Sequence, residues 1–161
     1  MTRASLLHLG LLLLASAAPF TAARPTGGAL GLMIAAPDEA SIRESNLTLQ
    51  VIMTNRTSQV MTVFKTNPGC DFTAEVKDSG GNPVPLTPAG AELSRCQRRL
   101  ILGRRILVTL KPGESTEESY PIDLYYGLAR PGSYTVRLTR EVTSQPKHIS
   151  RSNEIVLNLA R

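Results

Sequence analysis

The sequence predicts an all-β fold, an antiparallel β-sandwich of about seven short strands. Apolar and polar residues alternate with a period of two in segments along the chain, as they do in half-buried strands. Clusters of glycine, proline, asparagine and serine separate these segments, and such clusters favour turns. No segment carries a full amphipathic helix face with its 3.6-residue period. A closed barrel is the alternative arrangement of the same strands.

The first 23 residues have the composition of a secretory signal peptide. Arg3 supplies the basic region, residues 6–14 are apolar but too few to span a bilayer, and small residues at 15–17 and 21–23 offer cleavage sites. An uncleaved membrane anchor is the alternative, and it would be the only expected contact with a membrane. We expect residues 24–29 to form a flexible leader and residues 30–161 to form a single sandwich domain of a secreted, periplasmic or envelope protein.

Each expected strand is identified by apolar residues that would share one buried face. Two strands are expected near residues 30 and 60, in the segments LGLMIAA and QVMTVFK, and a short helical turn is expected at 91–94. Turn-forming residues occupy 54–59, 78–83, 111–114, 130–133 and 143–148. The inward-facing residues of the other five strands are Leu47, Leu49, Val51 and Met53; Phe72, Ala74 and Val76; Ile106, Val108 and Leu110; Tyr134, Val136 and Leu138; and Ile155, Leu157 and Leu159.

The segment LARPGSYTVRL combines a Pro-Gly turn with a tyrosine at the start of a strand. Pro131, Gly132 and Tyr134 predict a structural corner, in which the tyrosine hydroxyl bonds back to the backbone of the crossing loop. This order resembles the corner of fibronectin-type sandwiches, so the architecture is expected to be immunoglobulin-like. The antibody hallmarks are missing, because the chain has no tryptophan and its two cysteines lie too close together in sequence.

Four further segments extend this likeness: IMTNRTS, DFTAEVKDSGG, LKPGES and RPGSYTV. Their order resembles bacterial sandwich domains of the intracellular proteinase inhibitor type, over roughly residues 45–140. The resemblance implies the fold and offers protease inhibition as an alternative function, with loops 54–59, 78–90 and 111–120 as candidate contacts. This chain departs from that type in its export signal and its cysteine pair, and no reactive-loop residue is transferred to it.

Cys70 and Cys96 are the two cysteines of the chain, and we expect them to form a disulfide in an oxidising compartment. Closing a loop of about 27 residues would stabilise the fold by about 3–4 kcal/mol in the chain-entropy model. Two free buried thiols are one alternative. Half of a metal site, completed by His148, is the other.

The segment RCQRRLILGRR places five arginines within 11 residues. Guanidinium groups bind carboxylates, sulfates and phosphates in bidentate pairs, so the segment predicts a binding patch for a protein or an acidic envelope polymer. Several arginines would share one face if residues 98–102 and 104–110 paired as adjacent strands. The alternative is a charged strand edge that prevents aggregation. The five residues are Arg95, Arg98, Arg99, Arg104 and Arg105.

No catalytic constellation is evident, so the sequence predicts a non-enzymatic protein with no cofactor and no metal. His148 is the only histidine beyond the signal peptide, and a Ser-His-Asp hydrolase would depend on it. The acidic segment GESTEES is interpreted as a solvated polar loop, whose glutamates would line a small aromatic surface with the tyrosines at 120, 125 and 126. Residues 24–161 carry a net charge of 17 − 13 = +4, which is too small to favour nucleic acid.

Asn46 and Asn55 each begin an N-glycosylation sequon. Asn55, which falls in a turn, would be the better acceptor in a eukaryotic host. In a bacterial host, which we favour, both are ordinary polar residues. The function that the sequence predicts is therefore that of an exported β-sandwich that binds a partner at the cell envelope or outside the cell.

Overall fold

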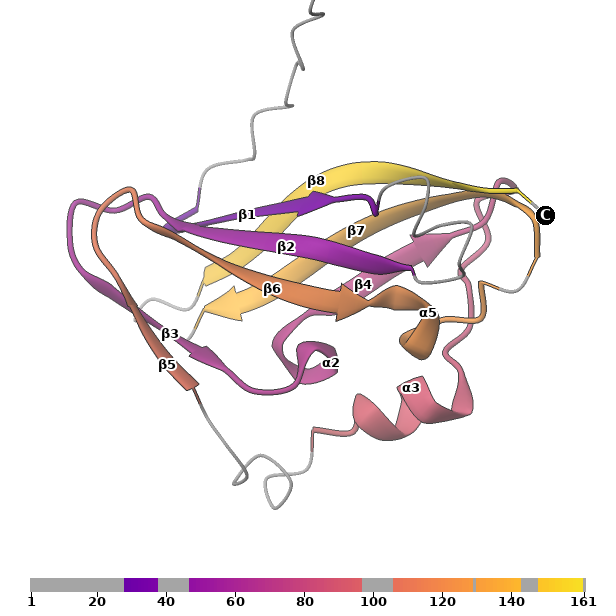
Figure 1. The fold of residues 1–161 in the computed structure, drawn as a ribbon, viewed down its shortest axis with the longest axis horizontal. Coiled ribbons are helices and arrows are strands. Elements are labelled where there is room, and N and C mark those ends of the chain that lie inside the picture. The colour runs from indigo at the N-terminus through magenta and orange to yellow at the C-terminus, as the bar shows by residue number, and fades with distance from the viewer. Residues whose placement is uncertain (1–27, 38–46, 97–105, 129, 143–147, 161) are drawn as a thin grey trace, which may run out of the picture.

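The computed structural model describes residues 28–37, 47–96, 106–128, 130–142 and 148–160, and it confirms the all-β fold. Within these residues, eight strands form three antiparallel sheets, one strand more than the sequence predicts. Two three-stranded sheets, β1-β2-β6 and β4-β7-β8, form the sandwich, and the two-stranded ribbon β3-β5 extends from one end (Figure 1).

The strands are β1 (Leu30–Ala35), β2 (Thr48–Asn55), β3 (Met61–Lys65), β4 (Thr73–Lys77), β5 (Ile106–Leu110), β6 (Ser115–Pro121), β7 (Gly132–Val142) and β8 (His148–Leu159). The described part of the chain also forms three short helices, which lie below the sandwich in Figure 1: α2 (Pro68–Asp71), α3 (Pro88–Leu93) and α5 (Ile122–Tyr125). The helix α3 contains most of the expected helical turn, and begins three residues earlier than expected because Thr87 caps it by accepting a hydrogen bond from the Gly90 amide.

The core lies between the two sheets and follows the predicted alternation. All four inward residues expected in β2 are buried, and so are the three expected in β7. Phe72, directly before β4, and Val76 within it are buried as expected, whereas Ala74 is half-buried. The outer faces carry polar residues, such as Arg137 on β7, which forms a 2.9 Å ion pair with Glu154 on β8, together with the exposed apolar side chains of Ile149 and Val156. The period-two pattern therefore predicted the faces of the central strands correctly.

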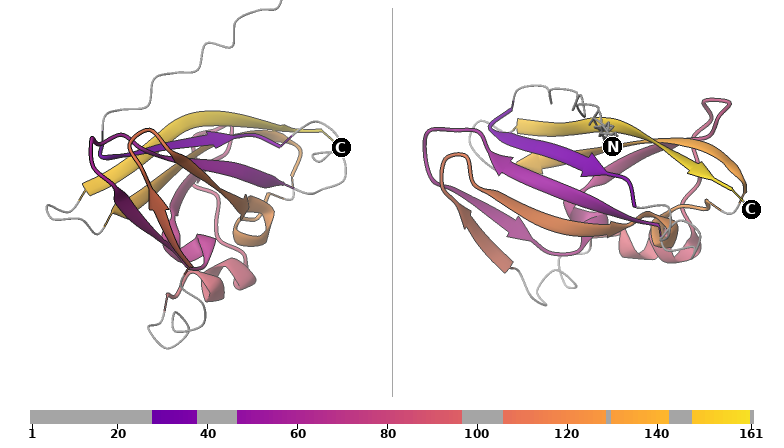
Figure 2. Two further views of the ribbon diagram at one scale, coloured as in Figure 1. Left: turned by 60° about the vertical axis from the view of Figure 1, so that its left-hand side comes forward. Right: turned by 45° about the horizontal axis from the view of Figure 1, so that its top comes forward.

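Side chains join the two sheets along one edge of the sandwich, where β1 lies beside β8 (Figure 2). The Ile34 amide donates to Asn153 Oδ1 at 2.8 Å, and Asn153 Nδ2 donates to the Ile34 carbonyl at 2.9 Å. Ser150 Oγ donates to the Leu30 carbonyl at 2.7 Å. These side chains pair with backbone groups of β1 that would otherwise be left open at a sheet edge.

The strand β6 corrects the interpretation of GESTEES as a loop, because residues 115–121 pair with β2 in register. Its neighbouring glutamates point to opposite sides: Glu117 is exposed, whereas the side chain of Glu118 is nearly buried. The sequence pattern hid this strand because its inward positions carry Thr116 and Glu118 rather than apolar residues.

The tyrosines next to β6 also correct an expectation, since two of them belong to the core. The rings of Tyr120 and Tyr125 are buried and stack with their centroids 4.9 Å apart. The Tyr126 hydroxyl donates to the Ala74 carbonyl at 2.8 Å. The expected acidic, aromatic surface is therefore wrong, because these rings fill the space between β6 and the helices.

The ribbon β3-β5 differs from the prediction for its second strand. The strand β5 pairs with β3, and residues 98–102, its expected partner, lie outside the described residues. Ile106 was expected to face the core but is 54% exposed, and Leu107 is 62% exposed. The ribbon leans away from the sandwich in Figure 1, and no second layer of described residues covers the N-terminal end of β5.

The predicted corner has the geometry expected of a tyrosine corner. The Tyr134 side chain is buried, and its hydroxyl donates to the Arg130 carbonyl at 2.9 Å, four residues upstream. Gly132, between them, has a φ of +149°, which L side chains rarely adopt. Pro131, Gly132 and Tyr134 thus direct the chain into β7.

One buried asparagine organises the turn between β2 and β3. Asn55 is 0% exposed, and its amide nitrogen donates to the carbonyls of Gln59 and Leu110 at 2.7 and 2.9 Å. Its amide oxygen accepts hydrogen bonds from the backbone and the hydroxyl of Thr57. A side chain so enclosed is not accessible to glycosylation in the folded protein, which removes Asn55 as the expected acceptor; Asn46 lies outside the described residues.

The substitution Asn55→Ala is expected to lower the free energy of unfolding by about 2–3 kcal/mol, because it leaves several buried backbone groups without partners. Denaturant unfolding followed by circular dichroism measures this change. Asn158→Ala is the matched control: its amide is exposed and bonds to the Ser133 hydroxyl, so a change below about 0.5 kcal/mol is expected. Equal effects of the two substitutions would contradict the role given to Asn55.

Candidate functional site

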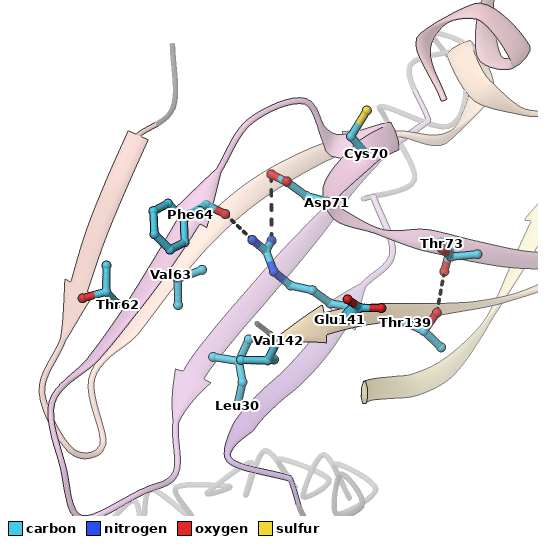
Figure 3. A pocket seen from close by; sticks show the side chains of 11 residues that line it. Leu30, Thr62, Val63, Phe64, Cys70, Asp71, Thr73, Thr139, Glu141 and Val142 are labelled. Carbon is cyan, nitrogen blue, oxygen red and sulfur yellow. Dashed lines mark hydrogen bonds and ion pairs between the residues drawn. The ribbon is translucent and has the colours of Figure 1, made fainter. Parts of the chain in front are cut away.

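A cavity of about 410 Å³ opens between β3, the helix α2 and the end of β7 (Figure 3). Thr62 and Phe64 line it from β3, and Asp71 lines it from α2. Thr139 and Glu141 line it from β7. The cavity therefore lies where the ribbon, the disulfide-bonded helix and the second sheet meet.

Arg140, near the end of β7, is the central charged group of this site. Its side chain is 6% exposed and also lines the cavity. Its Nη2 donates to the Phe64 carbonyl, and its guanidinium lies 5.0 Å from the centre of the Phe72 ring. The site thus holds a cation within the core, at the boundary between the sandwich and the ribbon.

Two carboxylates compensate the charge of Arg140. Its Nη1 lies 4.0 Å from Asp71 Oδ2 and 3.9 Å from Glu118 Oε2, and both carboxylate side chains are almost buried. Neither Arg140 Nη1 nor Glu118 Oε2 has a hydrogen-bond partner in the described part of the chain. These contacts are therefore mainly electrostatic, and their strength depends on burial in a low-dielectric environment.

Local backbone structure fixes the position of Asp71 at the end of α2. The Thr66 amide and hydroxyl donate to its two carboxylate oxygens at 2.6 and 2.7 Å. Asn67 caps the same helix by accepting a hydrogen bond from the Gly69 amide, and it also accepts one from the Tyr125 hydroxyl. The hydrogen bonds from Thr66 thus hold the Asp71 carboxylate toward Arg140.

Burial shifts the pKa values of the other two charged groups in opposite directions. Desolvation raises the pKa of Glu118, and the negative charge of Asp71 raises it further, while Arg140 opposes both effects. Desolvation also lowers the pKa of Arg140, whereas Asp71 and Glu118 raise it. Arginine stays protonated at neutral pH, whereas the raised pKa of Glu118 makes the folding stability depend on the ionisation of this carboxyl group.

The difference in the free energy of unfolding between the Glu118→Gln variant and the wild type is expected to shift in favour of the variant as the pH rises. Because folding raises the pKa of Glu118, the folded state holds its proton more tightly than the unfolded state does. The resulting stabilisation is complete below the unfolded pKa of roughly 4.3 and is lost as the pH passes the higher, folded pKa. Glutamine does not titrate, so the variant should gain relative stability across this window.

Urea unfolding at several pH values from 4 to 8 measures this difference. Glu117→Gln is the matched control, since Glu117 is the neighbouring residue on the exposed side of β6 and accepts a hydrogen bond from Gln50. Stability curves of wild type and Glu118→Gln that stay parallel over the whole pH range would show that the prediction is wrong.

The disulfide between Cys70 and Cys96 is confirmed, with its two Cα atoms 5.4 Å apart. It links α2 to the chain that follows α3. Both free-thiol and metal-site alternatives are therefore wrong for these two residues. A disulfide is compatible with an oxidising, extracytoplasmic location.

The other residues singled out from the sequence are only partly described. Arg95 is exposed and pairs with Glu92 at 2.9 Å. His148 is an exposed first residue of β8 rather than part of a loop. Four arginines lie outside the described residues: Arg98, Arg99, Arg104 and Arg105. The structure therefore places one member of the predicted arginine patch and leaves its extent a prediction.

The cluster of Asp71, Glu118 and Arg140 was missed at the sequence level. One signal was present: Arg140 continues the alternation that turns Tyr134 and Leu138 toward the core. A charged residue at an inward-facing strand position needs a buried counter-charge. The identity of that carboxylate cannot be read from the sequence, because Asp71 and Glu118 are distant from Arg140 along the chain.

A second surface feature lies on the ribbon, where three large apolar side chains are exposed. Phe64 and Leu107 are directly opposite each other in the β3-β5 register, at 43% and 62% exposure. Ile106 precedes Leu107 in the same strand and is also exposed, but its side chain projects from the other side of the ribbon. We call Phe64 and Leu107 the ribbon face. Clusters of large apolar side chains on a surface often mark interaction sites.

Comparison with known proteins identifies no relative, since no protein-family model matches the chain and no match is found among curated proteins.

Among the described residues, no group of three or more histidine, cysteine, aspartate or glutamate residues is arranged to hold a metal ion. Within the same residues, no helix has the length and apolar composition needed to cross a membrane.

Proposed function

We propose that the protein is an exported, non-enzymatic β-sandwich that binds a partner protein at the cell envelope or outside the cell. The observation that carries this proposal is the ribbon face, where Phe64 and Leu107 present apolar side chains to solvent, with Ile106 exposed on the other side of the same ribbon. Burying such side chains in an interface would stabilise a complex by roughly 25 cal/mol for each Å² of apolar surface removed from water. The signal-like N-terminus and the disulfide support the proposed location.

The arginine segment is proposed to contribute charge to the same interface. Arg105 and Arg104 lie two and three residues before Leu107, so each is joined to the ribbon face by at most about 10 Å of chain. Apolar side chains flanked by arginine are typical of protein interfaces, in which arginine is enriched. An acidic envelope polymer would be bound by the arginines but would leave the apolar side chains uncovered, so a protein is the better partner.

A pull-down from envelope extract tests the proposal. Leu107→Ser, and separately the replacement of Arg98, Arg99, Arg104 and Arg105 by serine, are each expected to reduce capture of the partner at least tenfold. Val156→Ser is the matched control, because Val156 is 55% exposed on β8, away from the ribbon. Partner capture that is equal for wild type and both ribbon variants would end this proposal.

Protease inhibition is a second candidate, favoured by the turn that Asn55 organises. Protease inhibitors gain affinity from loops held in one conformation before binding. Hydrogen bonds from the buried Asn55 amide to the Gln59 and Leu110 carbonyls hold the loop after β2 in one conformation. The side chains of Ser58 and Val60 in this loop are exposed. The adjoining loop before β6 is tied to it, since the Gly113 amide donates to the Asn55 carbonyl.

Assays against a panel of secreted serine and cysteine proteases test this candidate. Inhibition that is lost in Val60→Asp and retained in Val156→Asp would support it. No inhibition at micromolar protein, with the fold verified by circular dichroism, would remove it.

A further inference from the structure

The strand β5 has an outer edge whose backbone groups are open in the described part of the chain. Phe64 lies opposite Leu107 in the β3-β5 register, and the Phe64 carbonyl points away from β5, toward Arg140. Residues at such a position of an antiparallel ladder direct their backbone groups outward on both strands, and so do residues two positions further along. The amides and carbonyls of Leu107 and Thr109 therefore point away from β3, and the described residues supply no partner for them.

Four other strand edges of the described structure are capped by side chains from neighbouring elements. The donors are the Asn153 amide for β1, the Arg140 guanidinium for β3, the Tyr126 hydroxyl for β4 and the Lys65 ammonium for β6. Caps of this kind, prolines and charged residues all keep a strand edge from pairing with another chain. No described residue caps β5, and the sequence ILVTL contains no proline, glycine or charge. The edge of β5 is therefore suited to receive a strand.

Large apolar side chains are exposed on both faces of this edge. Leu107 projects from the ribbon face and Ile106 from the other side, at 62% and 54% exposure. A partner surface that rested on the ribbon face alone would cover Leu107 and leave Ile106 in water. A strand paired with β5 would place side chains beside both residues, because its own residues alternate between the same two faces. Strand addition therefore accounts for both exposed residues.

We propose that the outer edge of β5, here called the ribbon edge, accepts an extended segment of the partner protein with acidic residues at its ends, which pairs with β5 as a third strand of the ribbon. Peptides that add a strand to an open sheet edge gain affinity from backbone hydrogen bonds and specificity from alternate side chains. This inference rests on the proposed function, because it specifies how the partner is bound.

Charge favours an acidic segment over a second copy of this chain. In the sequence, Arg105 directly precedes β5 and Lys111 directly follows it. Two copies paired antiparallel and centred on Val108 would set Lys111 of one against Arg105 of the other, and opposed like charges destabilise a strand pair. Glu114 lies 3.9 Å from the Lys111 ammonium and offsets its charge in part. Residues 24–161 also carry a net positive charge, which attracts an acidic partner and repels a second copy.

Nuclear magnetic resonance titration of the full ¹⁵N-labelled protein tests the proposal with three synthetic probes. The first is the capped heptapeptide Glu-Val-Val-Thr-Val-Val-Glu. The second carries lysine in place of both glutamates, and the third is methylated on alternate backbone nitrogens so that it cannot pair as a strand. The first peptide is expected to shift the amide signals of residues 106–110 in a saturable manner and to slow hydrogen exchange at Leu107 and Thr109. The other two should bind at least tenfold more weakly.

A pair of protein variants at one position supplies the matched control. Thr109→Pro removes an outward N–H group, and proline is tolerated on edge strands where the N–H faces solvent. This variant should bind the first peptide at least tenfold more weakly. Thr109→Val keeps the N–H group and should bind as the wild type does. Thermal unfolding verifies that both variants fold; if Thr109→Pro does not, the comparison of the first and third peptides on the wild type decides the question.

Five outcomes would overturn the proposal. Two concern the first peptide: no saturable shifts at millimolar concentration, or binding equal to that of the methylated peptide. Binding equal to that of the lysine peptide would remove the acidic partner. Slow exchange of the Leu107 and Thr109 amides in the free, dilute protein would show that this chain already covers the edge. The same shifts on raising the protein concentration alone would identify a second copy as the occupant.

Failure of the proposed function is distinguishable in the pull-down. If Thr109→Pro captures the partner as the wild type does while Leu107→Ser does not, the ribbon edge is excluded and the ribbon face remains. If the first peptide binds at the ribbon edge but capture is unaffected by Leu107→Ser and by the arginine replacements, the ribbon edge remains and the proposed function is excluded.

Discussion

Replacing Arg140 by methionine is expected to lower the free energy of unfolding by about 3–5 kcal/mol at pH 7. Methionine fills a similar volume but removes the charge that compensates Asp71 and Glu118, whose side chains are 9% and 11% exposed. It also removes the donor to the Phe64 carbonyl and the contact with the Phe72 ring. Denaturant unfolding at constant ionic strength gives the change directly.

Two further variants make this result specific to the buried cluster. Arg137→Met removes the arginine of an exposed ion pair with Glu154 on the outer face of β7, and should cost less than about 1 kcal/mol. Adding Asp71→Asn and Glu118→Gln to Arg140→Met should restore part of the lost stability, because no uncompensated charge then stays buried. A loss for Arg140→Met no larger than that for Arg137→Met would refute the electrostatic account.

Removing the disulfide by replacing Cys70 and Cys96 with serine is expected to cost about 3–4 kcal/mol. The sequence separation of the two cysteines is 26, and opening a loop of this length restores chain entropy to the unfolded state. Chemical unfolding of the double variant, compared with wild type in the absence of reductant, measures this loss.

Treatment of the wild type with a dithiol reductant is the corresponding control. Reduced wild type and the double-serine variant should unfold at nearly the same denaturant concentration, because each lacks only the covalent link. A double-serine variant as stable as the oxidised protein would show that the native contacts between α2 and α3 suffice without the bond.

The sequence predicted the fold well wherever burial was apolar. The strands β2, β4 and β7 were found from their alternating residues, and the Tyr134 hydroxyl bonds to the carbonyl of the loop before it. The disulfide was also predicted correctly. Each of these features depends on residues close together in sequence, or on the only two cysteines in the chain, so no knowledge of the tertiary structure was needed.

The candidate site was missed because its residues are chosen by long-range contacts. Glu118 resembles its exposed neighbour Glu117 in sequence, and only the approach of Arg140 from the second sheet makes it a buried residue. The strand β6 was missed for the same reason, because its inward positions include Thr116 and Glu118, which the sequence pattern marks as polar and exposed. The prediction for the start of β5 was wrong for the opposite reason: Ile106 and Leu107 have the composition of a core strand, but no layer among the described residues covers them.

The contact between Asn153 and Ile34 has a consequence for how the two layers are aligned. Its amide presents one donor and one acceptor, the same pair of groups that a peptide unit offers, to a single residue of β1. A shift of β8 by one residue would bring Ser152 or Glu154 to that point: an ionised glutamate has no donor, and serine has one hydroxyl on a shorter side chain where asparagine has two separate groups. The contact therefore favours one offset between the sheets, as the bond from Ser150 to the Leu30 carbonyl also does. An aspartate there, although equal in size, would lose the donor and set its negative charge against the Ile34 carbonyl.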